Sequence, residues 1–267
     1  MMAKGETVAG DIAGAKMSCV RSWHWNRADF DAQWRRLCEC GSIETAGETI
    51  WQTRFKEVQL LTVPSDDGGY RVAFKNYHEK RFFRYFLRPS LATREAHGFA
   101  VVARLGIPVA EVLAFGENRR FLNLVDAYFV TKFEEGTKTM DDFLAHPEEH
   151  DKLLALLRDN IIRLAQLHAA GYIHGGAHPR NILWKESPGG GLESIWIDLA
   201  TVRRISTRRP NWKYVLTDLA DLTEKFKLTQ EELDRLAAEY RNSGGFPIAY
   251  RVRTDHYRKF SSAIRSE

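Results

Sequence analysis

Two polar residues bracket a short hairpin in the second half of the sequence, and this pattern constrains the fold most strongly. An apolar run beginning at Ile182 and a second run over 194–197 are separated by the turn-forming stretch 187–191, so they predict two antiparallel strands. Asn181 precedes the first strand and Asp198 follows the second. Because the outer ends of a hairpin lie side by side, the amide oxygen of Asn181 and the carboxylate of Asp198 are expected to converge. Magnesium prefers such oxygen ligands, so the sequence predicts a metal site there.

A helix and a loop precede this hairpin. Apolar residues recur at helical spacing through 153–170, and Gly171 follows as a typical C-terminal glycine, so the segment is predicted to be an amphipathic helix. The loop 174–181 then leads into the first strand. Taken singly, Asn181 and Asp198 are ordinary residues for a turn or a strand end. The ordered series of helix, glycine, loop and hairpin favours a functional site over that structural interpretation.

A lysine and a glutamate in the first half of the chain form a second candidate pair. Runs 58–63 and 69–77 predict a β-hairpin, and Lys75 lies near the end of its second strand. A predicted helix over 90–104 begins with a serine N-cap and carries Glu95. A carboxylate can hold the long lysine side chain in one rotamer, so that the ammonium group reaches bound phosphates. The alternative is that each charge lies on the solvated surface.

Several short motifs are shared with one enzyme family. They are Val72-Ala73-Phe74-Lys75, Arg94-Glu95, the run 105–116, the loop 174–181 with its His-Gly-x-x-His-Pro-x-Asn pattern, Ile197-Asp198-Leu199-Ala200 followed by Arg203-Arg204, and Asp218 in a Thr-Asp-Leu-Ala-Asp-Leu segment. In these motifs the chain resembles the protein-kinase-like superfamily and, within it, the bacterial lipopolysaccharide core kinases, which phosphorylate Kdo or heptose sugars. The resemblance extends from about residue 57 to about residue 227.

The resemblance implies an α+β fold of the two-lobed protein-kinase-like type. Residues 45–133 would form a small lobe with an antiparallel sheet, and residues 134–267 a mostly helical large lobe that ends in a basic tail. Residues 1–44 would be an N-terminal extension packed on the small lobe. ATP and Mg²⁺ would be the cofactors, bound between the lobes.

The resemblance also implies a role for each residue of the nucleotide site. Lys75 would bind phosphates, and Glu95 would orient Lys75. Asn181 and Asp198 would bind magnesium and serve catalysis. Asp218 would brace the catalytic loop from beneath.

A basic segment after the predicted metal residues indicates the acceptor. Arg203 and Arg204 would bind an anionic core sugar, because arginine recognises phosphate and carboxylate groups bidentately. The expected reaction is transfer of the γ-phosphoryl group of ATP to a sugar hydroxyl of the lipopolysaccharide inner core. A solvated face or an internal ion-pair network is the alternative explanation of the two arginines.

One position departs from the family pattern. Such enzymes place a catalytic aspartate five positions before the metal-binding asparagine, where this chain has Gly176. General-base help is worth about 10²–10⁴-fold, whereas positioning and charge neutralisation carry most of the acceleration. His178 is a candidate substitute base, but a packing role is the favoured interpretation. The alternatives are therefore a pseudokinase, which binds nucleotide or a partner without efficient catalysis, and a small-molecule kinase of the aminoglycoside type.

Composition sets the remaining bounds. With 267 residues, of which 44% are hydrophobic and 12% aromatic, the chain can build a sizeable core. The net charge of +4 is too small to indicate nucleic acid as a partner. No run approaches the roughly 18 apolar residues of a membrane-spanning helix, and the first residues lack a continuous apolar segment. A cytoplasmic location is expected, with peripheral association at the inner face of the inner membrane as a further option.

Overall fold

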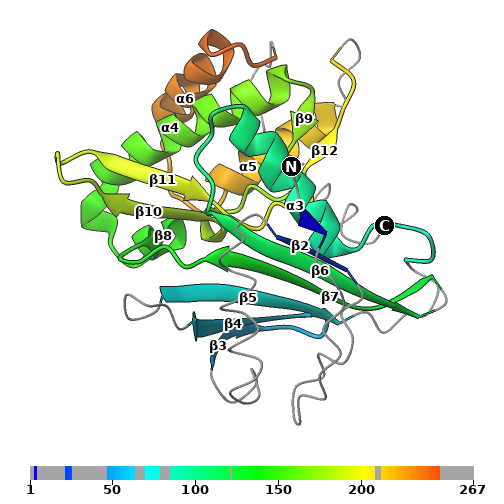
Figure 1. Cartoon of the computed structure of the whole chain (residues 1–267). Coiled ribbons are helices and arrows are strands. Elements are labelled where there is room, and N and C mark those ends of the chain that lie inside the picture. The colour runs from blue at the N-terminus through cyan, green and yellow to red at the C-terminus, as the bar shows by residue number, and fades with distance from the viewer. Residues whose placement is uncertain are drawn as a thin grey trace. The chain divides into compact units, whose positions relative to one another are not determined.

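The computed structural model describes residues 3–4, 22–25, 47–63, 70–78, 85–120, 122–207 and 212–246 (Figure 1). The chain divides into two compact units. The first unit comprises Met1–Phe99 and Ala110–Glu135, and the second comprises Ala100–Val109 and Gly136–Glu267. One division thus falls next to the expected lobe boundary at residues 133 and 134. A second division, around residues 100–109, was not anticipated from the sequence.

The first unit is built on an antiparallel sheet of seven strands in the order β1-β2-β6-β7-β5-β4-β3. These strands are β1 (Ala3–Lys4), β2 (Ser22–Trp25), β3 (Glu48–Gln52), β4 (Lys56–Val63), β5 (Tyr70–His78), β6 (Val112–Arg120) and β7 (Asn123–Lys132). The predicted hairpin of β4 and β5 forms with Val58 opposite Lys75. The expected N-terminal extension contributes β1 and β2 to one edge of this sheet, and its other residues lie outside the described ranges.

Helix α3 (Leu91–Arg104) packs on this sheet. The hydroxyl of Ser90 accepts a hydrogen bond from the backbone N–H of Thr93 at 3.1 Å, so the predicted N-cap is present. The ring of Phe99 lies 5.2 Å from that of Phe129 on β7, which places one face of the helix against the sheet. Side chains alternate along a strand, and therefore Lys75 and Tyr77 share one face of β5.

The second unit is mainly helical, with α4 (His150–Ala169), α5 (Trp212–Thr223) and α6 (Gln230–Asn242). Its short strands are β8 (Lys138–Thr139), β9 (Tyr172–Ile173), β10 (Ile182–Glu186), β11 (Leu192–Trp196) and β12 (Arg203–Arg204), and its 3-10 helices are η1 (Met140–Leu144), η2 (Pro147–Glu149) and η3 (Pro179–Asn181). Strands β11, β10 and β8 form one small sheet, and β12 pairs with β9. The stripe predicted for α4 is buried and includes Leu157, Ile161 and Leu164.

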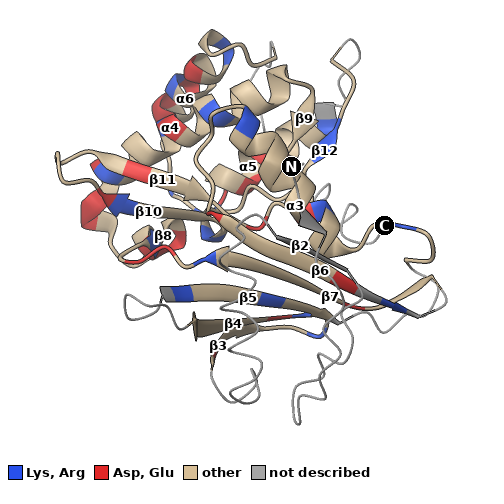
Figure 2. Cartoon of the chain, in the orientation of Figure 1, with Lys and Arg blue, Asp and Glu red and all other residues tan. Residues whose placement is uncertain are grey.

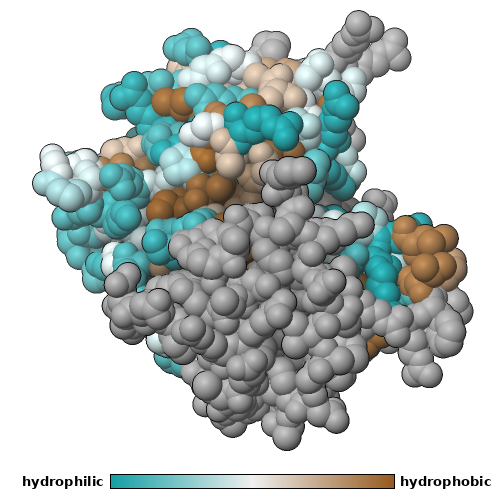
Figure 3. Space-filling model, in the orientation of Figure 1, coloured by the Kyte–Doolittle hydropathy of each residue, from teal (hydrophilic) through white to brown (hydrophobic). Residues whose placement is uncertain are grey.

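Helix α6 has one face that packs on the second unit and another face that is polar. Its N-cap Thr229 accepts a hydrogen bond from the backbone of Glu232, and it buries Leu236, Ala237 and Tyr240. Most of its other side chains are polar, and Figure 3 shows hydrophilic residues over this part of the surface. Within the described ranges, no helix combines the length and the apolar character that crossing a membrane requires.

Candidate active site

The predicted contact between Lys75 and Glu95 is present in the first unit. Nζ of Lys75 lies 2.5 Å from Oε1 of Glu95, and the two side chains are 8% and 0% exposed. The ammonium group also lies 5.7 Å from the centre of the Phe129 ring. Removing two charges from water is unfavourable, and a buried pair is tolerated only when its geometry and hydrogen bonds are good. The solvated-surface alternative is therefore excluded for both residues.

Tyr77 completes this pair, and its role was not predicted from the sequence. Its hydroxyl donates a hydrogen bond to Oε2 of Glu95, so each carboxylate oxygen of Glu95 has its own donor. Tyr77 is 4% exposed. Its spacing of two residues from Lys75 on one strand is the signal that would have found it, because such residues point to the same face of a sheet.

The hairpin of β10 and β11 forms as predicted in the second unit. Ile182 lies opposite Trp196 in the register, and the backbone N–H of Ile197 donates to the carbonyl of Asn181 at 2.9 Å. Asn181 and Asp198 are thereby brought to the same end of the hairpin. Nδ2 of Asn181 donates to the carbonyl of Gly176 at 3.0 Å, which fixes the orientation of the amide group.

The conformation of Asp198 distinguishes it from an ordinary strand-end residue. Its φ of 59° lies in the left-handed region, which is unfavourable for a residue with a Cβ by about 1–2 kcal/mol. Such outliers are concentrated at functional sites. An amide oxygen and a carboxylate at one hairpin end fit magnesium, which completes its shell with phosphate and water oxygens. Over the described ranges there is no cluster of three or more His, Cys, Asp or Glu side chains that could hold a metal without such help.

Asp218 on α5 braces the loop that precedes the hairpin. Its carboxylate accepts hydrogen bonds from the backbone N–H groups of His174 at 2.6 Å and Gly175 at 2.7 Å. Oδ2 also lies 3.1 Å from Nε2 of His168, whose Nδ1 is 2.8 Å from the hydroxyl of Tyr240. Asp218, His168 and His174 are buried in the second unit, so Asp218 holds the loop from its buried side in the manner that the resemblance implied.

The imidazole of His174 is buried, and neither ring nitrogen has a hydrogen-bond partner among the described residues. It lies against the indole of Trp196, with 5.1 Å between ring centres. Burial lowers the pKa of His174, and the nearby charges of Asp218 and Asp198 oppose that shift only in part. This histidine is therefore neutral near pH 7 and acts as a packing residue beneath the hairpin.

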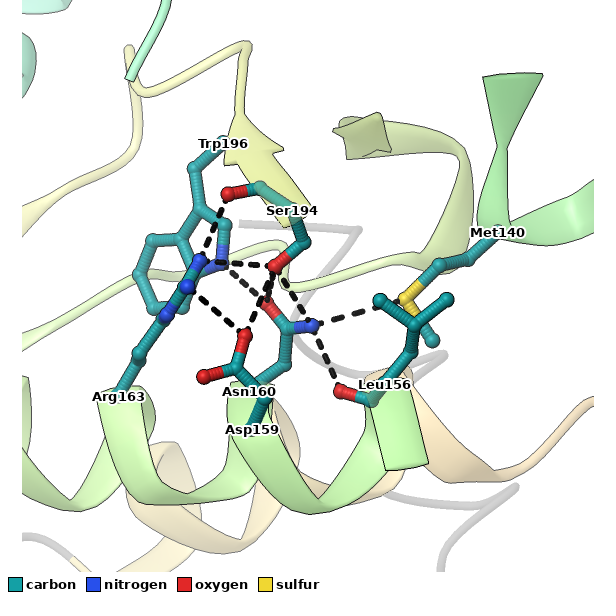
Figure 4. A network of polar contacts seen from close by, with 7 residues as sticks. All are labelled: Met140, Leu156, Asp159, Asn160, Arg163, Ser194 and Trp196. Atoms are coloured by element: carbon teal, nitrogen blue, oxygen red, sulfur yellow. Dashed lines mark hydrogen bonds and ion pairs between the residues drawn. The ribbon is translucent and has the colours of Figure 1, made fainter. Parts of the chain in front are cut away.

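A buried polar network connects α4 to β11, the strand that leads to Asp198 (Figure 4). The carboxamide of Asn160 is at its centre: Oδ1 accepts from Nε1 of Trp196 at 2.6 Å, and Nδ2 donates to the hydroxyl of Ser194 at 3.1 Å. Arg163 donates to the carbonyl of Ser194 at 2.8 Å and pairs with Asp159 at 2.8 Å. Burial lowers the pKa of Arg163, and the charge of Asp159 counteracts this. The network fixes β11 on the helix.

Gly176 occupies the position of the missing aspartate, and its surroundings do not require glycine. A Cβ built at Gly176 would lie 3.6 Å from Oγ1 of Thr201, an ordinary contact distance. The neighbouring Gly175 is different, since its φ is 73° and a Cβ there would lie 2.9 Å from the carbonyl oxygen of Thr201. The loop therefore requires glycine at position 175 for steric reasons. Gly176 departs from the family pattern in its chemistry, without a steric need for glycine.

His178 is turned toward α5. Its Nε2 lies 3.8 Å from Oδ2 of Asp221, and its side chain is 15% exposed. Its backbone carbonyl accepts the N–H of Asn181 at 2.8 Å, which closes η3. These contacts give His178 a structural role, and its service as a base stays a prediction.

The two arginines of β12, the strand coloured blue in Figure 2, are exposed. The guanidinium of Arg203 lies 4.1 Å from the centre of the Tyr214 ring, which limits its freedom. Neither Arg203 nor Arg204 has an ion pair with a described residue. The internal-network explanation is therefore not supported within the described ranges, and acceptor binding stays a prediction.

An antiparallel sheet with a buried lysine–glutamate pair, combined with a helical unit that carries the Asn181 and Asp198 hairpin, defines a protein-kinase-like fold. The sequence matches the model of the lipopolysaccharide kinase (Kdo/WaaP) family over residues 62–240, more than half of its length, and the chain belongs to that family. A solved structure described as WaaP in complex with acyl carrier protein is similar in fold. The two share 16% identity and a TM-score of 0.56, with 91% of this chain and 92% of the other covered. No curated protein matches.

Proposed function

We propose that this chain transfers the γ-phosphoryl group of ATP to a sugar hydroxyl of the lipopolysaccharide inner core at the cytoplasmic face of the inner membrane. Membership of the lipopolysaccharide kinase family supports the class of reaction. The observation that carries the proposal is the buried ion pair of Lys75 and Glu95. A charge pair in this environment contributes little net stability by itself, so a functional reason for keeping it is favoured.

In this proposal the residues of each unit have separate tasks. Lys75 binds phosphate oxygens, and Glu95 keeps the lysine side chain extended. Asn181 and Asp198 bind magnesium through oxygen atoms. Magnesium, when bound, neutralises charge on the phosphates and on the leaving group. Asp218 keeps the loop in place through its two backbone hydrogen bonds.

Arg203 and Arg204 bind the acceptor in the proposed reaction. Both are exposed on β12, which is paired with β9 in the register Arg203 to Ile173 and Arg204 to Tyr172. A strand-held pair of guanidinium groups suits a sugar that carries phosphate or carboxylate. Replacement of both by glutamine should raise the KM for the sugar acceptor and leave the KM for ATP unchanged.

Gly176 favours a second candidate function, that of a pseudokinase. A protein that keeps Lys75, Asn181 and Asp198 but lacks the carboxylate can bind nucleotide and signal through a partner without turnover. The space beside Gly176 makes the two candidates separable, because Gly176→Asp adds a carboxylate on a Cβ that would lie at ordinary contact distance from Thr201. A pseudokinase predicts no transfer by the wild-type chain and measurable transfer by this variant.

The deciding experiment measures core phosphate by mass analysis of lipopolysaccharide. Deletion of the gene should remove one phosphate from the inner core, and the wild-type chain should restore it. Asp198→Ala should fail to restore it, whereas Asp234→Ala should succeed, because Asp234 is an exposed residue of α6 whose partner is Gln230. An unchanged core phosphate after deletion would refute the proposed reaction, and rescue by Asp198→Ala would favour the pseudokinase.

A further inference from the structure

We infer that the hydroxyl of Thr201 orients the acceptor hydroxyl in the place of the missing catalytic aspartate. This inference rests on the proposed function and names the group that acts where Gly176 has no side chain. All the protein residues in this inference belong to the second unit, where they lie in the loop 174–181 and in the turn that contains Thr201.

The position of Thr201 relative to Gly176 carries the inference. Oγ1 of Thr201 lies 3.6 Å from the point where a Cβ at Gly176 would be, and among the described residues no other heavy atom outside 175–177 comes within 4 Å of that point. Thr201 follows Asp198 by three residues and belongs to the turn closed by the hydrogen bond from Val202 N–H to the carbonyl of Leu199 at 3.2 Å. The hydroxyl therefore stands beside the space that a carboxylate would fill.

Both ends of this arrangement are fixed by the backbone. The carbonyl of Gly176 accepts a hydrogen bond from Asn181, the predicted magnesium ligand. The carbonyl of Thr201 approaches Gly175 so closely that a Cβ there would lie 2.9 Å from it. The loop and the turn thus pack closely on each other, and this packing places Thr201 beside Gly176.

The hydroxyl of Thr201 is available for a ligand. Thr201 is exposed, whereas the flanking Ala200 and Val202 are buried. No side-chain hydrogen bond of Thr201 to another described residue is recorded. A threonine hydroxyl can donate one hydrogen bond and accept two, so it can accept a hydrogen bond from the hydroxyl of the acceptor sugar.

The chemistry needs orientation more than it needs a strong base. In the proposed step the acceptor oxygen forms a bond to the γ-phosphorus, the bond from that phosphorus to the bridging oxygen breaks, and ADP leaves with the electron pair. Thr201 accepts a hydrogen bond from the acceptor hydroxyl. This contact directs a lone pair of the acceptor oxygen toward phosphorus. The hydroxyl proton passes to an oxygen of the transferred phosphoryl group, since a neutral threonine cannot retain it. A loose transition state tolerates this late proton transfer.

The test compares five chains: wild type, Thr201→Val, Thr201→Ser, Gly176→Asp, and the double variant Gly176→Asp/Thr201→Val. Phosphate transfer from ATP to isolated, dephosphorylated lipopolysaccharide core is measured together with hydrolysis of ATP and calorimetric binding of ATP with magnesium. Thr201→Val should lower kcat by about tenfold with an unchanged KM for ATP, the size expected for one lost neutral hydrogen bond. Thr201→Ser should keep the wild-type rate.

The double variant distinguishes chemistry from packing. If Thr201 stands in for the carboxylate, Gly176→Asp should restore transfer in the Thr201→Val background to the rate of Gly176→Asp alone. A packing role predicts instead that Thr201→Val lowers Tm and ATP affinity, with no rescue. Equal rates for wild type and Thr201→Val would overturn this inference and leave the proposed function intact. A wild-type chain that neither transfers phosphate nor hydrolyses ATP would overturn both.

Discussion

Lys75 and Glu95 are joined by a 2.5 Å ion pair in which the carboxylate is fully buried. Glu95→Gln keeps the shape of the side chain and removes the buried negative charge that faces the ammonium group, so the free energy of unfolding should fall by about 3–5 kcal/mol. Urea denaturation measures this loss. The double variant Lys75→Met/Glu95→Gln should recover part of the stability but none of the nucleotide binding. Equal stability of the single and double variants would contradict this assignment.

Tyr77→Phe removes the hydroxyl that donates to Oε2 of Glu95 and leaves the ring in place. A hydrogen bond to a charged group is worth about 1.5–3 kcal/mol, and the variant should lose stability of that size in urea denaturation. Its affinity for ATP should also fall, because Glu95 then holds Lys75 less firmly. Tyr172→Phe is the matched control, since no hydrogen bond of the Tyr172 hydroxyl to a described residue is recorded, and it should change stability by less than about 0.5 kcal/mol.

Gly175→Ala and Gly176→Ala should differ sharply although the two positions are adjacent. Gly175 has a φ of 73° and no room beside the carbonyl of Thr201, so alanine there should lower the unfolding free energy by at least about 1 kcal/mol. Gly176 has ordinary contact distances, and alanine there should be neutral or stabilising. Thermal and urea unfolding of the two variants provide the comparison. Equal destabilisation would show that the loop also requires its second glycine.

The contact between Asn160 and Trp196 should be visible as a coupling energy. Trp196→Phe removes the 2.6 Å hydrogen bond to Oδ1 of Asn160, which keeps the longer contact with the Ser194 hydroxyl at 3.3 Å, and should lower stability by about 1–3 kcal/mol. Asn160→Leu and the double variant complete a cycle, whose coupling should exceed about 0.5 kcal/mol. As a control, Asn160→Leu combined with Trp51→Phe should be additive, because Trp51 is an exposed residue of β3. Additivity in both cycles would argue against the network.

Acid should weaken the folded state through His174. Burial lowers the pKa of His174 below its ordinary value of 6.5. Below pH 6.5 the imidazole is therefore protonated to a greater extent in the unfolded chain than in the folded chain. Its effect on stability is absent above pH 6.5 and grows as the pH falls, by up to about 1.4 kcal/mol per pH unit, until the folded pKa is reached. Urea denaturation between pH 5 and 8 should show a flatter profile for His174→Phe.

Local patterns were sufficient to predict the elements that carry the candidate site. The apolar spacing of α4, the serine cap of α3 and the turn between β10 and β11 each depend on neighbours in sequence, so they can be read without coordinates. The hairpin register then brings Asn181 and Asp198 to one end. The pairing of Lys75 with Glu95 was predictable only through the resemblance, because the two lie on different elements.

Contacts that depend on packing could not be predicted. Asn160 lies on α4 and Ser194 on β11, and nothing in the sequence of either element indicates that their side chains meet. Tyr77 was not singled out in the sequence, while the structure buries its ring beside Glu95. The steric difference between Gly175 and Gly176 also depends on Thr201, which is distant in sequence.

The open space at Gly176 has an evolutionary consequence. Two of the four glycine codons differ from an aspartate codon by one base, and the backbone at this position already accepts a larger residue. A single point mutation could therefore convert the loop between its two chemical forms without a folding barrier.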